Sequence, residues 1–200
     1  MELDDSESKK ICESLGFKKD LSIHMEYAAS RFTLAEDASY GEEMTTAIGQ
    51  GDTLATPLQM AMVAAAVANG GTLMKPYYVD SISTYDGDAV KTFKPSSYAS
   101  VMSAAEAETI GNYMVTTVKS GTASALSGAS YTAAGKTGSA EDDTASGERG
   151  THSWLVGYSN VDHPDLAIAV IAEDGSSGSA AAVPIAKYVF DTYYQNKYGY

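Results

Sequence analysis

Four consecutive residues, Lys136, Thr137, Gly138 and Ser139, combine a cation, two hydroxyl groups and a position without a side chain. Such a run can offer positive charge and hydrogen bonds while its glycine lets a ligand approach the backbone closely. A three-residue string appears by chance in about a few per cent of chains of this length, so its context has to support it. The run follows small and β-compatible residues, 131–134, and precedes a turn-rich segment. We therefore expect it on a strand.

A second string, Lys119-Ser120-Gly121, has a similar pattern in a different context. It follows Ser103 and Glu106, which have the spacing of a capping box, and then a run with helical periodicity. Gly121 is predicted to end this helix as the glycine just beyond its last turn. We therefore interpret Lys136-Thr137-Gly138 as the functional copy.

Lys-Thr-Gly is one of three short motifs in enzymes that acylate a serine with D-alanyl peptides or β-lactams. The other two, Ser-x-x-Lys on a helix and Ser-x-Asn on a loop, normally precede it. Ser6 and Lys9 match the first pattern formally, but they open a highly charged terminal segment. A catalytic serine and lysine need a dry, packed helix start so that the lysine can lose its proton. We expect no catalytic role for this pair, which leaves half of the site absent.

Several segments together resemble the transpeptidase domain of penicillin-binding proteins. They occur in the family's order over roughly residues 25–195, and Ala28-Ala29-Ser30-Arg31-Phe32 indicates the class B members. The other segments are Ile48-Gly49-Gln50-Gly51-Asp52, Leu54-Ala55-Thr56-Pro57-Leu58-Gln59-Met60-Ala61, Ala134-Gly135-Lys136-Thr137-Gly138-Ser139-Ala140-Glu141 and His152-Ser153-Trp154-Leu155-Val156-Gly157-Tyr158. The chain departs from the family in starting after the serine helix and the Ser-x-Asn loop. It also has Ser139 where threonine is most frequent, a change that keeps the hydroxyl.

The resemblance implies a role for each residue of the motif. Thr137 and Ser139 would hold the terminal carboxylate of a D-alanine peptide by hydroxyl hydrogen bonds, and Lys136 would add positive potential and assist proton transfer. Gly138 would let the substrate add to the strand edge. The backbone N–H of Ser139 would join that of the nucleophile in the oxyanion hole. The implied catalytic residues are thus Lys136 and Ser139, and no cofactor is expected.

Other polar residues have simpler interpretations. We interpret His152 as a hydrogen-bonding surface residue at a strand start, with a general base as the alternative. Glu141, Asp142 and Asp143 are consecutive, lack a histidine partner and are expected in a solvated loop, so we predict no metal site. Gly175-Ser176-Ser177-Gly178 is expected to form a turn that could border the cleft. The single cysteine, Cys12, excludes an intrachain disulfide and is expected to be a buried apolar residue.

The composition narrows the class of protein. A net charge of −13 argues against nucleic acid as a partner and against docking of this part on an anionic bilayer. No apolar run approaches the roughly 18 residues of a membrane-spanning helix, and the acidic N-terminus is not a signal peptide. The expected activity lies outside the membrane, yet this sequence carries no export signal. We therefore expect the chain to have been cut from a longer protein.

The predicted fold is α+β, a small antiparallel sheet covered by helices in a single domain, residues 1–200. The resemblance makes it a partial penicillin-binding-protein transpeptidase (serine β-lactamase-like) fold. Three strands are expected, with the lysine motif and 166–172 outermost, because the link 161–165 is short enough for an antiparallel pair. Ile185, Tyr188, Val189 and Tyr193 would cover the sheet from a final helix. The other expected elements are helices at 7–15, from Thr56 to 68 and at 104–119, and a hairpin of 77–84 and 89–93 around Asp86-Gly87.

The leading functional hypothesis is the C-terminal part of a peptidoglycan D,D-transpeptidase that binds stem peptides and β-lactams. It would act at the outer face of a bacterial membrane, through an anchor upstream. The alternatives are a D,D-carboxypeptidase or serine β-lactamase, and a non-catalytic binding module. The isolated chain is expected to be inactive without the upstream part. Its strand 166–172 would expose an unpaired edge, masked by another copy, by a rearranged terminus or by the hairpin.

Overall fold

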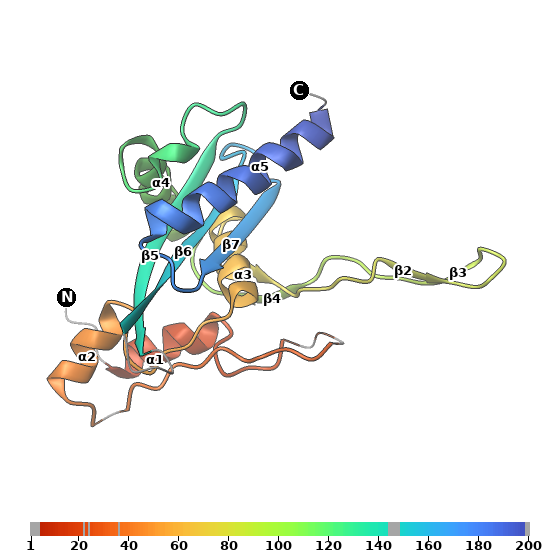
Figure 1. Ribbon diagram of the computed structural model, residues 1–200. Helices are drawn as coiled ribbons and strands as arrows, with labels where there is room; N and C mark the ends of the chain where they lie inside the picture. Colours follow the sequence, from red (N-terminus) through yellow and green to blue (C-terminus); the bar gives the residue numbers. More distant parts are fainter. Residues whose placement is uncertain (1–4, 22, 24, 36, 144–148, 199–200) are drawn as a thin grey trace.

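A three-stranded antiparallel sheet between two layers of helices forms the centre of the molecule, shown by the computed structural model in Figure 1. The structure describes residues 5–21, 23, 25–35, 37–143 and 149–198. In chain order the elements are α1 (Asp5–Ser14), α2 (Tyr40–Ala47), α3 (Pro57–Ala68), β1 (Thr72–Met74), β2 (Ser81–Ser83), β3 (Ala89–Thr92), β4 (Ser97–Ser100), α4 (Ala104–Ser120), the 3₁₀ turn η1 (Ser124–Leu126), β5 (Ala133–Asp143), β6 (Arg149–Ser159), β7 (Leu166–Ala172), the π-helical turn η2 (Gly178–Ala182) and α5 (Val183–Tyr198).

The strand order is β5-β6-β7, which confirms the predicted sheet and its outer strands. β7 covers the predicted residues, and Ser159 pairs with Leu166 next to the short turn. β5 is longer than expected, since Glu141 pairs with Thr151 and the pairing continues to residue 143. The prediction of a loop at 141–143 is therefore wrong, because pairing with β6 outweighs the weak strand propensity of acidic residues.

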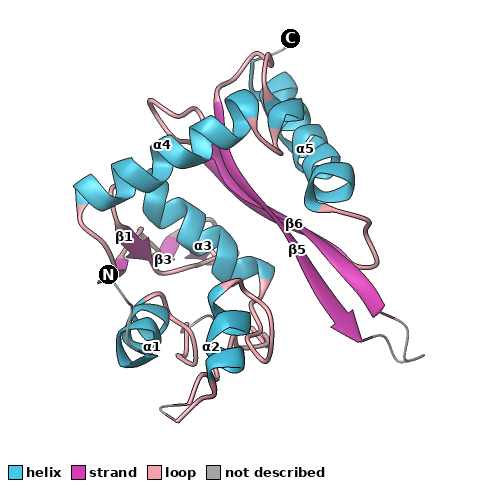
Figure 2. Cartoon of the chain, turned by 90° about the vertical axis from the view of Figure 1, so that its left-hand side faces the viewer, coloured by secondary structure: helices cyan, strands magenta, loops and turns pink. Residues whose placement is uncertain are grey.

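The two faces of the sheet are covered by different helices, α5 on one and α3 with α4 on the other (Figure 2). Ala133 and Leu155 pack with Phe190 of α5, whereas the neighbouring Ala134 and the cross-strand Tyr158 pack with α3 and α4. Successive side chains of a strand point to opposite faces. The alternation continues along β5, so adjacent residues of the lysine motif serve different sides of the sheet.

The helices α3 and α4 begin as the sequence predicts. Thr56 accepts a hydrogen bond from the Gln59 amide, and Ser103 forms the full capping box with Glu106. Gly121 does end α4, but as the C-cap residue with an extended backbone (φ −112°) rather than the position beyond it. A side chain there would come within 2.8 Å of the Thr117 carbonyl, so close approach explains the glycine.

The predicted buried face of α5 is wrong for three of its four residues, since only Tyr193 packs against the core. Ile185, Tyr188 and Val189 are exposed, and the residues packed on the sheet are Val183, Ala186, Phe190 and Tyr194. Apolar residues surround most of this helix, so their presence alone does not identify the inner stripe. The inner stripe contains the small Ala186 and follows the buried Ala182, which lets the helix approach the sheet closely.

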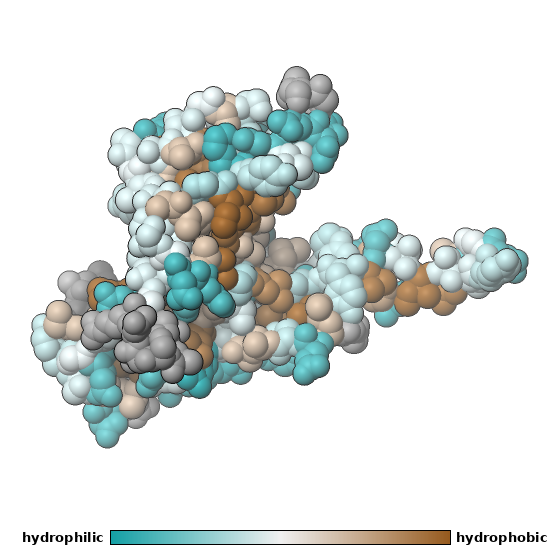
Figure 3. Space-filling view, viewed as in Figure 1, coloured by the Kyte–Doolittle hydropathy of each residue, from teal (hydrophilic) through white to brown (hydrophobic). Residues whose placement is uncertain are grey.

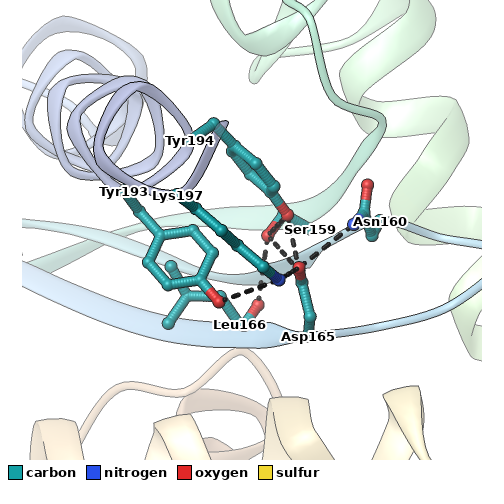
Figure 4. Close-up of polar contacts among 7 residues, drawn as sticks. All are labelled: Ser159, Asn160, Asp165, Leu166, Tyr193, Tyr194 and Lys197. Carbon is teal, nitrogen blue, oxygen red and sulfur yellow. Dashed lines mark hydrogen bonds and ion pairs between the residues drawn. The ribbon is translucent and has the colours of Figure 1, made fainter. Parts of the chain in front are cut away.

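A polar cluster fixes the end of α5 to the β6–β7 turn (Figure 4). The Tyr194 hydroxyl lies 2.5 Å from the Asp165 carboxylate and 2.8 Å from the Ser159 hydroxyl. Lys197 donates to the same carboxylate at 2.8 Å, and the Asn160 amide at 3.1 Å. Each buried polar atom of this junction thus has a partner, as a packed interior requires.

The hairpin of β2 and β3 forms a sheet of its own and extends away from the body (Figure 1). Its turn at Asp86-Gly87 is as predicted, and its exposed Val79, Ile82 and Val90 contribute apolar surface along the arm (Figure 3). The hairpin does not pair with β7, so the expectation that it could mask that edge is wrong. Within the described residues the outer edge of β7 has no strand partner. The short pair β1–β4 had no clear signal in the sequence.

Candidate active site

The lysine motif lies on β5, as predicted, with Lys136 opposite Val156 and Gly138 opposite Trp154 of β6. Lys136 is exposed and belongs to the sheet face that carries α3 and α4. Its ammonium group donates to the Thr137 carbonyl oxygen at 2.6 Å. Within the described residues β5 pairs only with β6, so its outer edge carries no second strand.

Thr137 points to the opposite face and is buried. Its hydroxyl oxygen lies 2.5 Å from that of Thr122, which follows α4. This pairing holds the rotamer of Thr137 and links the motif to the end of α4. Thr122 carries no sequence signal of its own, because its role depends on a contact between the end of α4 and the strand β5 that only the fold creates.

Ser139 shares the face of Thr137 but is exposed. Its hydroxyl oxygen accepts a hydrogen bond from the Gly178 amide at 3.3 Å, and its carbonyl oxygen accepts one from the Gln50 side chain at 3.4 Å. Two segments far apart in the sequence, Gly49-Gln50-Gly51 and the start of η2, thus meet at this residue. The segment 175–178, predicted as a turn bordering the cleft, leads into η2, and its Gly178 contacts the motif, but none of its residues lines the cavity that opens beside the motif.

A cavity of about 520 Å³ opens beside the motif on the Lys136 face. Residues of three segments form its walls: Ile48, Gly49, Gln50, Gly51, Thr53, Leu54, Ala55 and Met60 from the segment that leads into α3, Lys136 to Glu141 from β5, and His152, Trp154 and Val156 from β6, with Phe17 and Ile171. A second, apolar groove of about 340 Å³ lies between α3 and α4, and Lys136 lines both. The ammonium group is therefore at the junction of the two spaces.

Of the other polar residues considered in the sequence, His152 lines the cavity, whereas Ser6 and Lys9 do not. His152 is half-buried in the cavity wall rather than a surface residue, on the same face as Lys136. Ser6 and Lys9 lie on α1 and do not line the cavity. Cys12 is half-buried on the same helix, and burial raises the pKa of its thiol. Within the described ranges no cluster of His, Cys, Asp and Glu has the arrangement of a metal site.

The family profile of the penicillin binding protein transpeptidase domain matches residues 2–191. The chain therefore belongs to the penicillin-binding protein transpeptidase family, and it is of the class B type. This confirms the resemblance carried by the motifs and the α+β fold class.

Relatives of known name agree with this assignment. The chain is 35% identical over 151 residues to the peptidoglycan D,D-transpeptidase PbpA of Mycolicibacterium smegmatis, covering 71% of this chain and 30% of the relative. It is 32% identical over 174 residues to the peptidoglycan D,D-transpeptidase MrdA of Haemophilus influenzae, covering 78% and 26%. The chain thus spans less than a third of these relatives.

Solved structures show the same fold. The D,D-transpeptidase domain of a peptidoglycan glycosyltransferase from Eggerthella lenta superposes with a TM-score of 0.86 at 30% identity, over 98% of this chain and 49% of that one. Penicillin-binding protein A of Mycobacterium tuberculosis, solved as a ceftriaxone acyl-enzyme complex, gives 0.83 at 26% identity, over 93% and 42%. The present chain corresponds to about half of each of these structures.

Proposed function

We propose that the protein containing this chain is a peptidoglycan D,D-transpeptidase that cross-links stem peptides through an acyl-serine and is acylated by β-lactams. Residues 1–200 would form the C-terminal part of its transpeptidase domain. The observation that carries the proposal is the Lys136-Thr137-Gly138 strand, whose outer edge has no strand partner among the described residues and which forms one wall of a cavity. The names of the relatives support the same reaction.

The motif residues then have distinct tasks. An extended D-alanyl peptide adds to the outer edge of β5, where Gly138 leaves the backbone accessible. The Ser139 hydroxyl binds the terminal carboxylate, and Thr137 does so by exchanging its bond to Thr122. The Ser139 N–H supplies one donor of the oxyanion hole, and Lys136 supplies positive potential and assists proton transfer.

The nucleophile comes from the upstream part of the same protein. Lys136 lies at the junction of the cavity and the apolar groove between α3 and α4. A helix bearing the serine would fill that groove and bring its hydroxyl to the motif. The relatives are long enough to contain such a segment, since the chain covers 30% or less of each.

The remaining functional assignments follow from the same proposal. The substrate is a peptidoglycan stem peptide outside the bacterial cytoplasmic membrane, with the anchor upstream. The helices within the described ranges include none long and apolar enough to cross a bilayer. No cofactor takes part. The segments Gly49-Gln50-Gly51-Asp52 and Thr56-Pro57-Leu58-Gln59, which resemble those of the transpeptidases, support this activity over that of a carboxypeptidase or a β-lactamase.

The test compares two lysines in the full-length protein encoded by the open reading frame. Lys136→Ala should slow acylation by a fluorescent penicillin about 10²-fold or more. Lys119→Ala is the matched control, since Lys119 belongs to the similar string at the end of α4. Acylation that is unaffected by the first change, or equally slowed by both, would refute the assignment of the motif.

A further inference from the structure

A fully buried serine on β6, Ser153, holds the segment that contacts Ser139. Its hydroxyl donates to the Ser177 carbonyl and accepts a hydrogen bond from the Ala182 amide at 3.3 Å. These two partners are the residue before η2 and the last residue of η2. One side chain therefore joins both ends of the π-helical turn to the sheet, and π turns are frequent at functional sites.

The turn fits against the lysine motif without spare room. A side chain at Gly178 would come within 2.7 Å of the Gly138 carbonyl oxygen and 2.9 Å of the Thr137 Cβ. A side chain at Gly175 would come within 2.7 Å of the Ser153 Cβ. These three distances are shorter than the contacts that Cβ atoms make in proteins, so neither glycine has room for a side chain. A small displacement of the turn therefore changes the surroundings of the motif directly.

The direction of the hydrogen bonds gives this contact a chemical role. The Gly178 N–H donates to the Ser139 hydroxyl oxygen at 3.3 Å. A hydroxyl that accepts one hydrogen bond keeps its own proton for donation, and the accepted bond strengthens that donation. Ser139 is exposed, so its proton is available to an anion at the edge of β5.

We propose that Ser153 is a positioning residue for carboxylate recognition: it holds η2 so that the Gly178 amide orients the Ser139 hydroxyl toward the carboxylate of the substrate. The inference rests on the proposed function, because it concerns the same site. Without the Ser153 hydroxyl, the Ala182 amide loses its bond to that hydroxyl, and the Ser177 carbonyl keeps only the amides of Ala180 and Ala181, at 3.1 Å, so both ends of η2 lose this tie to the sheet and the turn can move. The Ser139 hydroxyl then loses its fixed orientation.

The experiment measures second-order acylation rates of the full-length protein with benzylpenicillin and with its methyl ester, which lacks the carboxylate. Ser153→Ala should lower the rate for benzylpenicillin about tenfold, the effect of one well-placed hydrogen bond to a charged group, and change the ester rate by less than about twofold. Gly175→Ala displaces the turn at Ser153, without meeting the lysine motif, and should show the same selectivity. Ser176→Ala is the control, since Ser176 is exposed in the segment just before η2, and it should leave both rates unchanged.

A general structural role would lower both rates together, and that result, or no loss with either variant, would overturn the inference. If Ser153→Ala fails to fold, Gly175→Ala decides alone by the same ratio of rates. An unsubstituted protein that benzylpenicillin does not acylate would instead refute the proposed function, and the inference with it. The two failures are therefore distinguishable.

Discussion

Removing the hydroxyl of Tyr194 should weaken the attachment of α5 to the sheet. Tyr194 is 3% exposed, and its ring stacks on that of Tyr131 with centroids 4.8 Å apart. Tyr194→Phe keeps the ring and this stacking. It removes only the hydroxyl that bonds to Asp165 and Ser159 (Figure 4). The change therefore isolates the polar contact from the packing.

The magnitude follows from the partners that remain. A hydrogen bond to a charged group contributes about 1.5–3 kcal/mol, and leaving a buried partner unsatisfied adds to the cost. Asp165 keeps Lys197 at 2.8 Å and Asn160 at 3.1 Å, whereas the buried Ser159 hydroxyl keeps only contacts of 3.5 Å. We expect Tyr194→Phe to lower the free energy of unfolding by about 2 kcal/mol.

The pH dependence of this difference gives a second criterion. Burial and the bond to Asp165 raise the pKa of Tyr194 to about 12, so its stabilisation is complete below the unfolded value of 10 and is lost as the pH rises through about 12. Burial alone would raise the pKa of Asp165, but bonds from Lys197 and Tyr194 lower it below 3.8. That stabilisation is present above 3.8 and is lost as the pH falls through the lowered pKa.

Urea unfolding of the chain, followed by circular dichroism and by the fluorescence of its single tryptophan, measures the effect at several pH values. Tyr188→Phe is the matched control, since Tyr188 is 73% exposed on the same helix. The difference between the two variants should be largest near neutral pH and smaller in strong acid and strong alkali. Equal stabilities of the two variants at pH 7 would refute the reasoning.

Two further predictions concern packing and association. Phe190→Ala should lower the free energy of unfolding by about 3–5 kcal/mol, because Phe190 is fully buried beneath Tyr131; a cost below about 1 kcal/mol in urea unfolding would contradict the assigned inner face of α5. The outer edge of the half-buried β7, which has no strand partner within the described residues, should make the isolated chain associate, and sedimentation over a range of concentrations will detect this association. A monomer at all concentrations would count against it.

The sequence predicted the elements whose signals are local. Alternating apolar residues identify β6 and β7, the Thr56 and Ser103 caps fix the starts of α3 and α4, and short links fix the antiparallel order. These features depend on neighbours a few residues apart. Local signals were therefore sufficient for the sheet and for the position of the lysine motif on it.

The parts that were missed depend on contacts between distant segments. Thr122 meets Thr137, and Ser153 meets Ser177, only because of the faces that β5 and β6 present. The inner face of α5 is likewise decided by the sheet it packs on, since apolar residues surround much of the helix. A small polar residue such as Ser153 occurs mostly on the surface, and no sequence pattern shows when it is instead buried and hydrogen-bonded to another segment.

The central claim is that this chain carries the substrate-binding half of a serine acyltransferase site whose nucleophile lies upstream. The direct measurement is labelling with a fluorescent penicillin, on the isolated chain and on the full-length protein, followed by mass-spectrometric mapping of the acylated residue. We expect no stoichiometric labelling of the isolated chain, and in the full-length protein an acylated serine of a Ser-x-x-Lys sequence before residue 1. Stoichiometric acylation of the isolated chain at Ser6 would contradict the account.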